Sequence, residues 1–281
     1  MILVFGATGQ VATALQRHGD VVALGRAEAD LTDPDVCAAA ILSRPCRAVI
    51  NAAAYTAVDN AEGEEALATK INGDAPGAMA RACAEKGVPF VHISTDYVFD
   101  GGGKDAWLPE DAVAPLGAYG RSKLAGEVAV RAAGGTSAIL RTSWVFSATG
   151  GNFVKTMLRL GAERDRLTIV KDQIGGPTSA KDIADTCLAI AAQLVADPSR
   201  AGIYHLSGAP DVSWADFARE IFRQSGLTPE VVDIPSSEFP QQAVRPANSR
   251  LDCTSLTDTF GVARPDWRVA LRDVLTDLKG I

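Results

Sequence analysis

Short apolar runs, each ended by glycine or a polar residue, alternate with longer amphipathic segments up to about residue 206. Apolar runs of this length predict strands buried in a parallel sheet, and apolar residues three and four apart predict helices. The predicted strands are 1–5, 21–24, 47–51, 89–94, 137–141, 167–170, 203–206 and 231–234. The predicted helices are a segment ending at Leu15, 34–43, 64–86, the segment containing Tyr119, 152–161, 181–194, 213–225 and a closing helix after Trp267.

The alternation of strands and helices predicts an α/β fold, a Rossmann-like doubly wound parallel sheet with a smaller C-terminal substrate-binding region. We predict a dinucleotide-binding domain over 1–150, to which 172–206 contribute. The substrate-binding region is predicted from 207–281 and parts of 151–171, because the strand–helix units stop there. The two regions are expected to be interleaved, with the smaller one closing a cleft at the sheet edge.

The composition narrows the classes of function. The chain has 281 residues, a net charge of -7 and a pI of about 5.1, which argues against a nucleic-acid or anionic-membrane surface. It contains no apolar run of bilayer length and no basic leader, and its five cysteines are scattered without metal-ligand spacing. We therefore expect a cytoplasmic protein with reduced thiols and no metal site in its sequence motifs.

A glycine pattern, Gly6-x-x-Gly9, directly follows the first predicted strand and opens a helix. Strand, glycine turn and helix form the dinucleotide-binding arrangement. Gly6 would permit the tight turn, and Gly9 would let the backbone approach a pyrophosphate at the helix N-terminus. The third small position is Ala12. A plain strand–helix turn is the competing interpretation.

The second predicted strand ends Leu24-Gly25-Arg26, without the acidic residue that binds the ribose 2′-hydroxyl of NAD. Arg26 could instead face a 2′-phosphate, which favours NADP(H), with NAD(H) kept as the second possibility. The competing interpretation is that Arg26 is a solvated loop residue. Asp30 and Leu31 follow in a loop that could pass near the adenine.

Tyr119 and Lys123 are four residues apart, so on a helix they lie on one face, one turn from each other. A free tyrosine titrates at about 10, and a nearby positive charge favours the phenolate and lowers that pKa. The pair is suited to a proton donor and the group that tunes it. A solvated helix face is the competing interpretation.

Polar and aromatic residues follow two further predicted strands. Thr95 and Asp96 come directly after the strand 89–94, and Trp144 comes just past the strand 137–141. Ligands bind at the carboxyl edge of a parallel sheet, so these residues are well placed for chemistry. The competing interpretation is a strand-end cap and turn.

Taken together, the glycine turn, Thr95 and the Tyr119–Lys123 pair resemble the extended short-chain dehydrogenase/reductase family. The likeness is closest to the branch that reduces a keto group on a nucleotide-linked sugar, and it extends over nearly the whole chain. Its segments 94–101 and 141–146 are specific to that branch. The segments that carry the likeness are 6–11, 51–59, 94–101, 119–127, 141–146, 152–158 and 245–251.

The resemblance implies a role for each matching position. Tyr119 would donate a proton to the sugar 4-keto oxygen, Lys123 would hold the nicotinamide ribose and lower the pKa of the tyrosine, and Thr95 would hydrogen-bond the carbonyl. Asp96 and Trp144 would contact the sugar. The residues that would line the cofactor are Gly6, Gly9, Gln10, Val11, Asp30, Leu31, Ala54, Tyr55 and Thr56.

A sugar nucleotide carries a diphosphate, which requires cations. Arg245 and Arg250 are the candidates because arginine suits bidentate phosphate contact, and a structural salt bridge is the alternative for each. Some relatives form dimers bridged by magnesium through surface glutamates. Those glutamates have no match here, so Mg²⁺ and the choice between monomer and homodimer stay open.

Two rival functions come from the same resemblance. A sugar-nucleotide dehydratase usually carries glutamate after the aspartate of strand four, where this chain has Tyr97, and an epimerase keeps NAD tightly bound. The other rival is the non-catalytic regulatory subunit of methionine adenosyltransferase, which resembles this reductase family. Intact Thr95, Tyr119 and Lys123 argue against that binding role.

Overall fold

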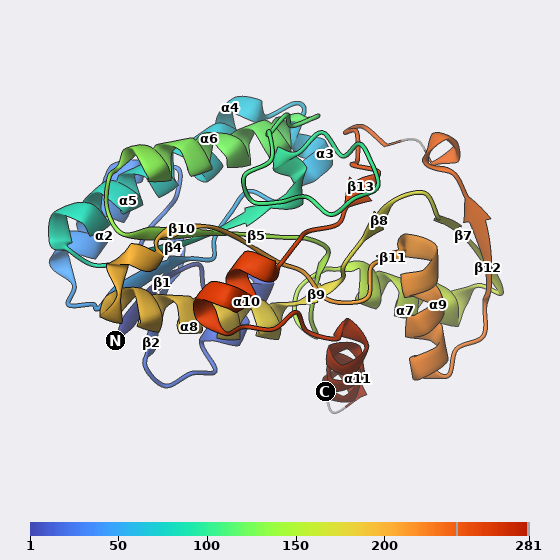
Figure 1. The fold of residues 1–281 in the computed structure, drawn as a ribbon. Helices are drawn as coiled ribbons and strands as arrows, with labels where there is room; N and C mark the ends of the chain where they lie inside the picture. Colours follow the sequence, from blue (N-terminus) through green and yellow to red (C-terminus); the bar gives the residue numbers. More distant parts are fainter. Residues whose placement is uncertain (240, 280–281) are drawn as a thin grey trace.

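The computed structural model describes residues 1–239 and 241–279 and has three layers, a parallel sheet between two layers of helices (Figure 1). Six parallel strands lie in the order β2–β1–β3–β4–β5–β10. The chain leaves β1 in one direction and returns to β3 on its other side, which creates a switch point between these two strands. The strands are β1 (Ile2–Phe5), β2 (Val21–Leu24), β3 (Ala48–Asn51), β4 (Phe90–Thr95), β5 (Ser137–Thr142) and β10 (Gly202–Leu206).

Each face of the sheet is covered by helices, which explains why β1 is apolar along its length, β3 is apolar up to Asn51, and both are buried throughout. One core lies between the sheet and α1 (Gln10–Leu15), α8 (Ala180–Ala196) and α10 (Thr254–Phe260). The other lies under α2 (Pro34–Ser43), α5 (Ala75–Lys86) and α6 (Ala118–Ala132). These positions confirm the prediction of a doubly wound sheet.

The predicted helix 64–86 is helical over its length but not uniform. It consists of α4 (Glu65–Thr69), a π-helical turn (Lys70–Asp74) and α5. Such turns change the direction in which a helix presents its side chains and occur often at functional sites. Here the π turn contains Asn72, whose buried side chain hydrogen-bonds the backbone of Tyr55.

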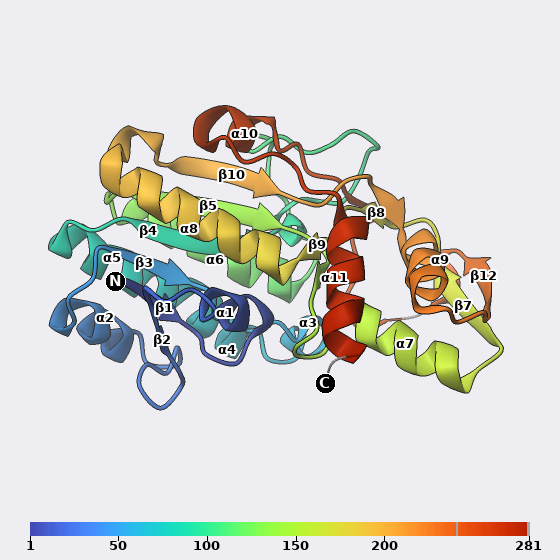
Figure 2. The ribbon, with the colours of Figure 1, turned by 90° about the horizontal axis from the view of Figure 1, so that it is seen from below.

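A second, smaller group of elements lies beyond the carboxyl ends of the sheet strands (Figure 2). It contains α7 (Phe153–Glu163), α9 (Trp214–Ser225), α11 (Trp267–Lys279) and a parallel pair, β7 (Arg166–Val170) with β12 (Glu230–Ile234). Phe146, Phe217 and Trp267 are among the buried residues of its own apolar core. The predicted substrate-binding region includes Pro240, Gly280 and Ile281, which lie outside the described residues.

Short elements that no periodic pattern predicted connect the two groups. β6 (Val145–Phe146) pairs with β9 (Thr178–Ser179), and β8 (Ile174–Gly175) lies between β11 (Val212–Ser213) and β13 (Asn248–Ser249). α3 (Val58–Ala61) was also missed. Elements of two to four residues are too short to show a period, so their positions depend on tertiary contacts.

Candidate active site

A cleft of about 880 Å³ opens at the carboxyl edge of the sheet, where the switch point lies. Its walls contain every residue predicted to bind the cofactor and all three predicted catalytic residues, together with Asp96 and Trp144. Arg245 and Arg250 are not among the lining residues. The fold therefore brings together residues from five strand ends that are far apart in sequence.

The glycine turn forms one end of the cleft. Gly6 has a φ of 102°, and a Cβ atom there would lie 3.3 Å from the backbone nitrogen of Ala53, so a larger residue would be strained and crowded. Gly9 precedes α1, and a Cβ atom there would have only the carbonyl of Ala52 nearby, at 3.9 Å. The backbone at Gly9 is thus open to a close ligand, while Ala12 is fully buried beneath it. These residues fit a dinucleotide.

The end of β2 lies in the same cleft. Gly25 and Arg26 line it, and the Arg26 side chain is exposed. The backbone nitrogen of Gly25 donates to Glu28 Oε2 at 3.0 Å, which fixes the turn after the strand. Arg26 thus lines the cleft with an exposed side chain, and its contact with a 2′-phosphate stays a prediction.

Asn72 connects the cofactor side of the cleft to the helix of the catalytic pair, and sequence reasoning gave it no role. Its side chain accepts from Tyr55 N at 2.8 Å and donates to Tyr55 O at 3.0 Å and to Ser122 Oγ at 2.9 Å. Ser122 Oγ in turn donates to Tyr119 O at 2.7 Å. The only signal in the sequence was an asparagine within an amphipathic helix.

Tyr119 and Thr95 bring two hydroxyl groups to the cleft. Tyr119 is the second residue of α6 and is half-buried, and its ring packs edge-on against Tyr97 with centroids 5.4 Å apart. Burial, together with the charge of Asp96, raises the pKa of Tyr119 to about 12, and a hydrogen bond with Thr95 acts in the opposite direction. The phenol is therefore protonated at neutral pH and able to donate.

Lys123 lies one turn further along α6 and is almost completely buried. Its Nζ donates to Ile93 O at 2.7 Å, at the end of β4. Burial lowers the pKa of Lys123 to about 8, while the nearby Glu127 carboxylate raises it. Burial and the charge of Asp96 outweigh any lowering by Lys123, whose ammonium group is bound to a carbonyl, so the expected net fall in the pKa of Tyr119 does not occur.

Asp96 is a buried carboxyl group next to both hydroxyls. Thr95 Oγ1 donates to its Oδ1 at 3.0 Å, and its Oδ2 has no hydrogen-bond partner among the described residues. Burial raises the pKa of Asp96 to about 6, against hydrogen bonds from Ser249 and Thr95 that lower it. An unpaired buried acceptor is costly, which makes Asp96 Oδ2 a candidate for a ligand contact.

A buried ion pair lies behind the catalytic helix and was not predicted. Arg141 of β5 and Glu127 of α6 form two hydrogen bonds, at 2.9 and 2.7 Å, and both side chains are 2% exposed. Ser94 Oγ also donates to Glu127 Oε1, at 2.5 Å. The pair joins β4, β5 and α6 directly beneath Lys123.

The two predicted phosphate-binding arginines lie in the second region. Arg245 Nη2 forms an ion pair with Asp59 Oδ2 at 2.7 Å, which joins the loop before β13 to α3. Arg250 Nη1 donates to Asn248 Oδ1 at 2.9 Å. Arg245 thus has the structural contact that was its alternative interpretation, and the diphosphate role of both residues stays a prediction.

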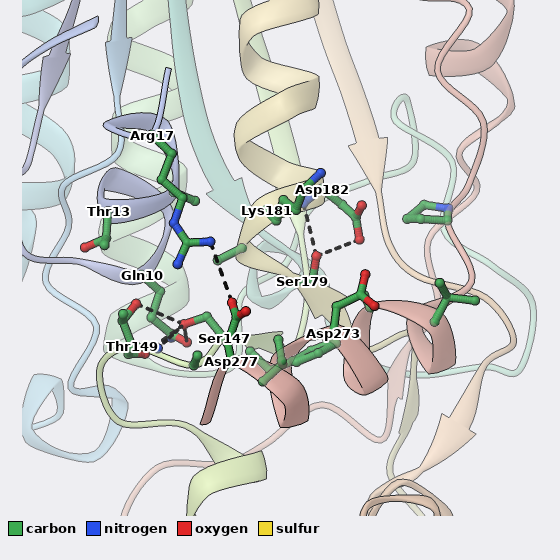
Figure 3. Close-up of a pocket in the computed structure, with 18 of the residues that line it drawn as sticks. Gln10, Thr13, Arg17, Ser147, Thr149, Ser179, Lys181, Asp182, Asp273 and Asp277 are labelled. Atoms are coloured by element: carbon green, nitrogen blue, oxygen red, sulfur yellow. Dashed lines mark hydrogen bonds and ion pairs between the residues drawn. The ribbon is translucent and has the colours of Figure 1, made fainter. Parts of the chain in front are cut away.

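A second cavity, of about 300 Å³, lies between α1, the start of α8 and α11 (Figure 3). Gln10 lines both cavities, and its Oε1 accepts from Ser147 Oγ at 2.9 Å and from Asn152 Nδ2 at 3.0 Å. The Ser179–Asp182 hydrogen bond caps α8 at its wall. None of the predicted catalytic or substrate-contacting residues reaches this cavity.

Over residues 1–239 and 241–279, the side chains of His, Cys, Asp and Glu form no group of three that could hold a metal ion. Within the same described ranges, no helix is both long and apolar enough to cross a membrane.

Comparison with known proteins gives consistent matches over the full chain. A family model described as RmlD substrate binding domain matches residues 1–279. The chain is 44% identical over 281 residues to a dTDP-4-dehydrorhamnose reductase of Sinorhizobium fredii, with 96% of this chain and 95% of the relative covered.

Solved structures agree. The crystal structure of a dTDP-4-dehydrorhamnose reductase from Clostridium acetobutylicum is 37% identical, covers 99% of each chain and gives a TM-score of 0.92. The dTDP-4-dehydrorhamnose reductase from Bacillus anthracis, in complex with NADP, is 33% identical, covers 98% of each chain and gives a TM-score of 0.90.

Substitution of the buried carboxylate tests the electrostatics of the site. Because the folded protein raises the pKa of Asp96 from 3.8 to about 6, the stability given by its protonated form is present below pH 3.8 and is lost as the pH rises through about 6. We expect Asp96→Asn to raise the free energy of unfolding by up to roughly 3 kcal/mol at pH 7.5 and by less at pH 5. Urea denaturation at the two pH values measures this.

Asp100→Asn, at an exposed carboxylate in the same loop, is the matched control and should change stability by less than about 0.5 kcal/mol. If Asp96→Asn does not raise the free energy of unfolding, or raises it equally at both pH values, the electrostatic account is contradicted.

Proposed function

The chain belongs to the family of dTDP-4-dehydrorhamnose reductases, and we propose that its cleft reduces the 4-keto group of dTDP-4-dehydro-6-deoxy-L-mannose with NADPH. The product is dTDP-L-rhamnose, and the reaction is the last step of dTDP-rhamnose biosynthesis. One observation carries the assignment: the hydroxyl groups of Thr95 and Tyr119, with Lys123, share a single cleft with a glycine turn that fits a dinucleotide.

When bound, NADPH would supply a hydride to C4 of the sugar. The electron pair of the carbonyl would then move to the 4-oxygen, which would become a developing alkoxide and need a proton. Tyr119 is protonated at neutral pH and donates this proton. Thr95 hydrogen-bonds the same oxygen, so two donors stabilise the charge where it develops.

Lys123 completes the constellation. Below its pKa of about 8 the side chain is an ammonium group one helical turn from Tyr119. Its positive charge stabilises the phenolate that remains after proton transfer, before solvent returns the proton. Its position at the cleft wall also suits a hydrogen bond to the nicotinamide ribose.

The sugar and nucleotide are assigned to the other end of the cleft. Asp96, with its unpaired Oδ2, and Trp144 contact the sugar from the cleft wall. Arg250 and Arg245, which lie outside the residues that line the cleft, are proposed to bind the diphosphate. We further propose a division into a cofactor domain, 1–150 with 172–206, and a substrate-binding region, 207–281 with parts of 151–171. The position of the second group of elements, at the carboxyl edge of the sheet, supports this division.

We also propose a cytoplasmic location, supported by five free cysteines, four of which are buried. The expected partner is the nucleotide-sugar substrate, with no nucleic-acid or membrane surface, and the protein is a monomer or homodimer.

The direct test is NADPH oxidation by the purified protein with enzymatically made dTDP-4-dehydro-6-deoxy-L-mannose. We expect stoichiometric dTDP-L-rhamnose, and Tyr119→Phe should lower kcat by about 10²- to 10⁴-fold because the proton donor is lost. The Kd for NADPH should stay close to that of the wild type. Retained turnover in Tyr119→Phe would remove Tyr119 as the acid, and binding of NADPH without turnover by the wild type would favour the regulatory-subunit function.

The pH dependence of the rate tests Lys123. Its ammonium form is present below the pKa of about 8 and is lost as the pH rises through that value, so kcat/KM should fall above about pH 8. Lys123→Arg is the matched control, since arginine stays charged over this range. The variant should be slower but lack the alkaline fall, and an identical fall in both proteins would assign it to another group.

Arg250→Ala tests the diphosphate site. Loss of a bidentate phosphate contact should raise the KM for the sugar nucleotide by about tenfold, and the KM for NADPH by less. Arg200→Ala, which removes an arginine paired with Asp197 and outside the cleft, is the control for the loss of positive charge. An unchanged substrate KM would remove Arg250 from the site.

A further inference from the structure

Trp144 has an unusual backbone conformation. Among the residues that the structure describes, it is the one residue other than glycine with a positive φ, at 49°. Side chains with a Cβ atom rarely adopt this left-handed region, and they persist there where the surroundings fix them. Trp144 lies between β5 and β6 and lines the cleft. Its conformation therefore determines what the cleft presents to a ligand.

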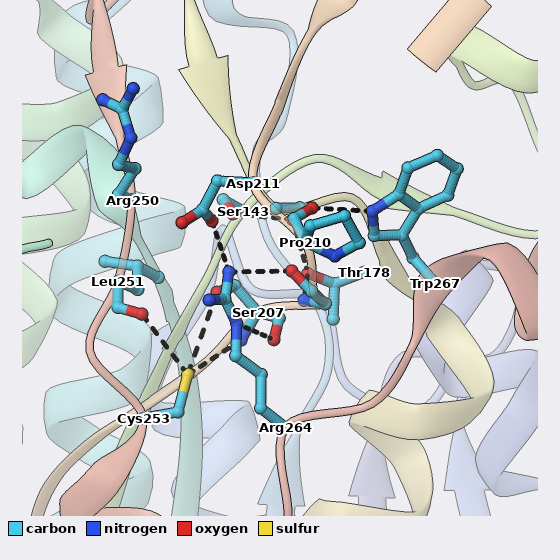
Figure 4. A network of polar contacts seen from close by, with 12 residues as sticks. Ser143, Thr178, Ser207, Pro210, Asp211, Arg250, Leu251, Cys253, Arg264 and Trp267 are labelled. Carbon is cyan, nitrogen blue, oxygen red and sulfur yellow. Dashed lines mark hydrogen bonds and ion pairs between the residues drawn. The ribbon is translucent and has the colours of Figure 1, made fainter. Parts of the chain in front are cut away.

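The backbone on both sides of Trp144 is fixed by hydrogen bonds. Ser143 Oγ donates to Gly176 O at 3.1 Å, and Trp144 O accepts from Thr178 N at 3.2 Å. Figure 4 shows Ser143 and Thr178 in a network of polar contacts that also contains Arg264. These bonds hold the main chain. The orientation of the indole is set by the contacts of the ring itself.

The indole of Trp144 lies against a second tryptophan. The rings of Trp144 and Trp214 are stacked, with centroids 3.6 Å apart and planes 12° from parallel. A Cβ atom at Gly175 would lie 2.9 Å from Trp144 Cε2, so glycine is needed beside the ring. Trp214 is itself held, since its Nε1 donates to Gln173 Oε1 at 3.1 Å and Phe153 packs on it with centroids 4.6 Å apart.

We propose that Trp214 is a positioning residue for sugar recognition. Trp144 comes from the end of the sheet and Trp214 is the first residue of α9, so the stack spans the two groups of elements. By covering one face of the Trp144 indole, Trp214 holds that ring against the cleft in its left-handed conformation. This inference rests on the proposed function, in which Trp144 contacts the sugar.

A purely structural role for Trp214 makes a different prediction. Trp214 packs against the apolar core of the second group, where Phe217, one turn further along α9, is fully buried. If Trp214 served only that core, its loss would lower the melting temperature and would weaken the binding of every ligand of that region by the same factor. If Trp214 instead positions Trp144, its loss weakens the binding of a ligand whose sugar reaches Trp144 and leaves the binding of a ligand without the sugar unchanged.

The test compares the Kd of dTDP-L-rhamnose with that of dTDP by calorimetry, with NADP⁺ present. Trp214→Leu removes the stack, and we expect it to weaken binding of dTDP-L-rhamnose by about 3- to 10-fold relative to dTDP, as for loss of an aromatic pair. Trp214→Phe keeps a flat ring and should restore the wild-type ratio. Phe217→Leu, in the same core, should lower the melting temperature and leave the ratio unchanged.

Each outcome decides the inference. A Kd for dTDP-L-rhamnose that rises relative to the Kd for dTDP in Trp214→Leu, and returns in Trp214→Phe, supports it. An unchanged ratio of the two Kd values in Trp214→Leu, or an equal rise in Phe217→Leu, overturns it while leaving the reductase assignment intact. A wild-type protein that binds neither dTDP-L-rhamnose nor its keto precursor would overturn the proposed function and this inference together.

Discussion

The buried ion pair between Glu127 and Arg141 determines how α6 lies on the sheet. Glu127 follows Lys123 by one turn of the helix and bonds both Arg141 and Ser94, the residue before Thr95. Arg141 also donates to Pro109 O at 3.0 Å, in the loop before α6. Since removal of one partner from a buried pair costs about 3–5 kcal/mol, the helix has little freedom to slide or rotate. The positions of Tyr119 and Lys123 therefore depend on an ion pair that lies outside the walls of the cleft.

The sheet could be predicted because each of its strands is a short apolar run, and parallel strands buried on both faces leave that pattern. Most of the site could also be predicted, from the positions of its residues relative to the strands. Thr95, Asp96 and Trp144 come just after strands, and the carboxyl ends of parallel strands share one edge. The spacing of Tyr119 and Lys123 placed both on one helical face. Topology alone was enough to bring these residues together.

The parts that sequence did not predict depend on contacts between distant segments. The pKa of Tyr119 is set by burial and by Asp96, so the spacing to Lys123 alone gave the wrong direction. The pairing of Arg245 with Asp59 joins residues 186 positions apart, and no local pattern indicates it. The stack of Trp144 on Trp214 likewise joins two regions. Each is a property of the assembled chain.

The path of the chain limits how this protein can be recombined. After forming α7 and β7 in the second group, the chain returns to the sheet as α8 and β10 and then leaves again for α9. Exchange of the segment after β10 alone would leave half of the second core, including Phe146 and α7, with the parent sequence. A single crossover near residue 207 would therefore combine two halves of different cores.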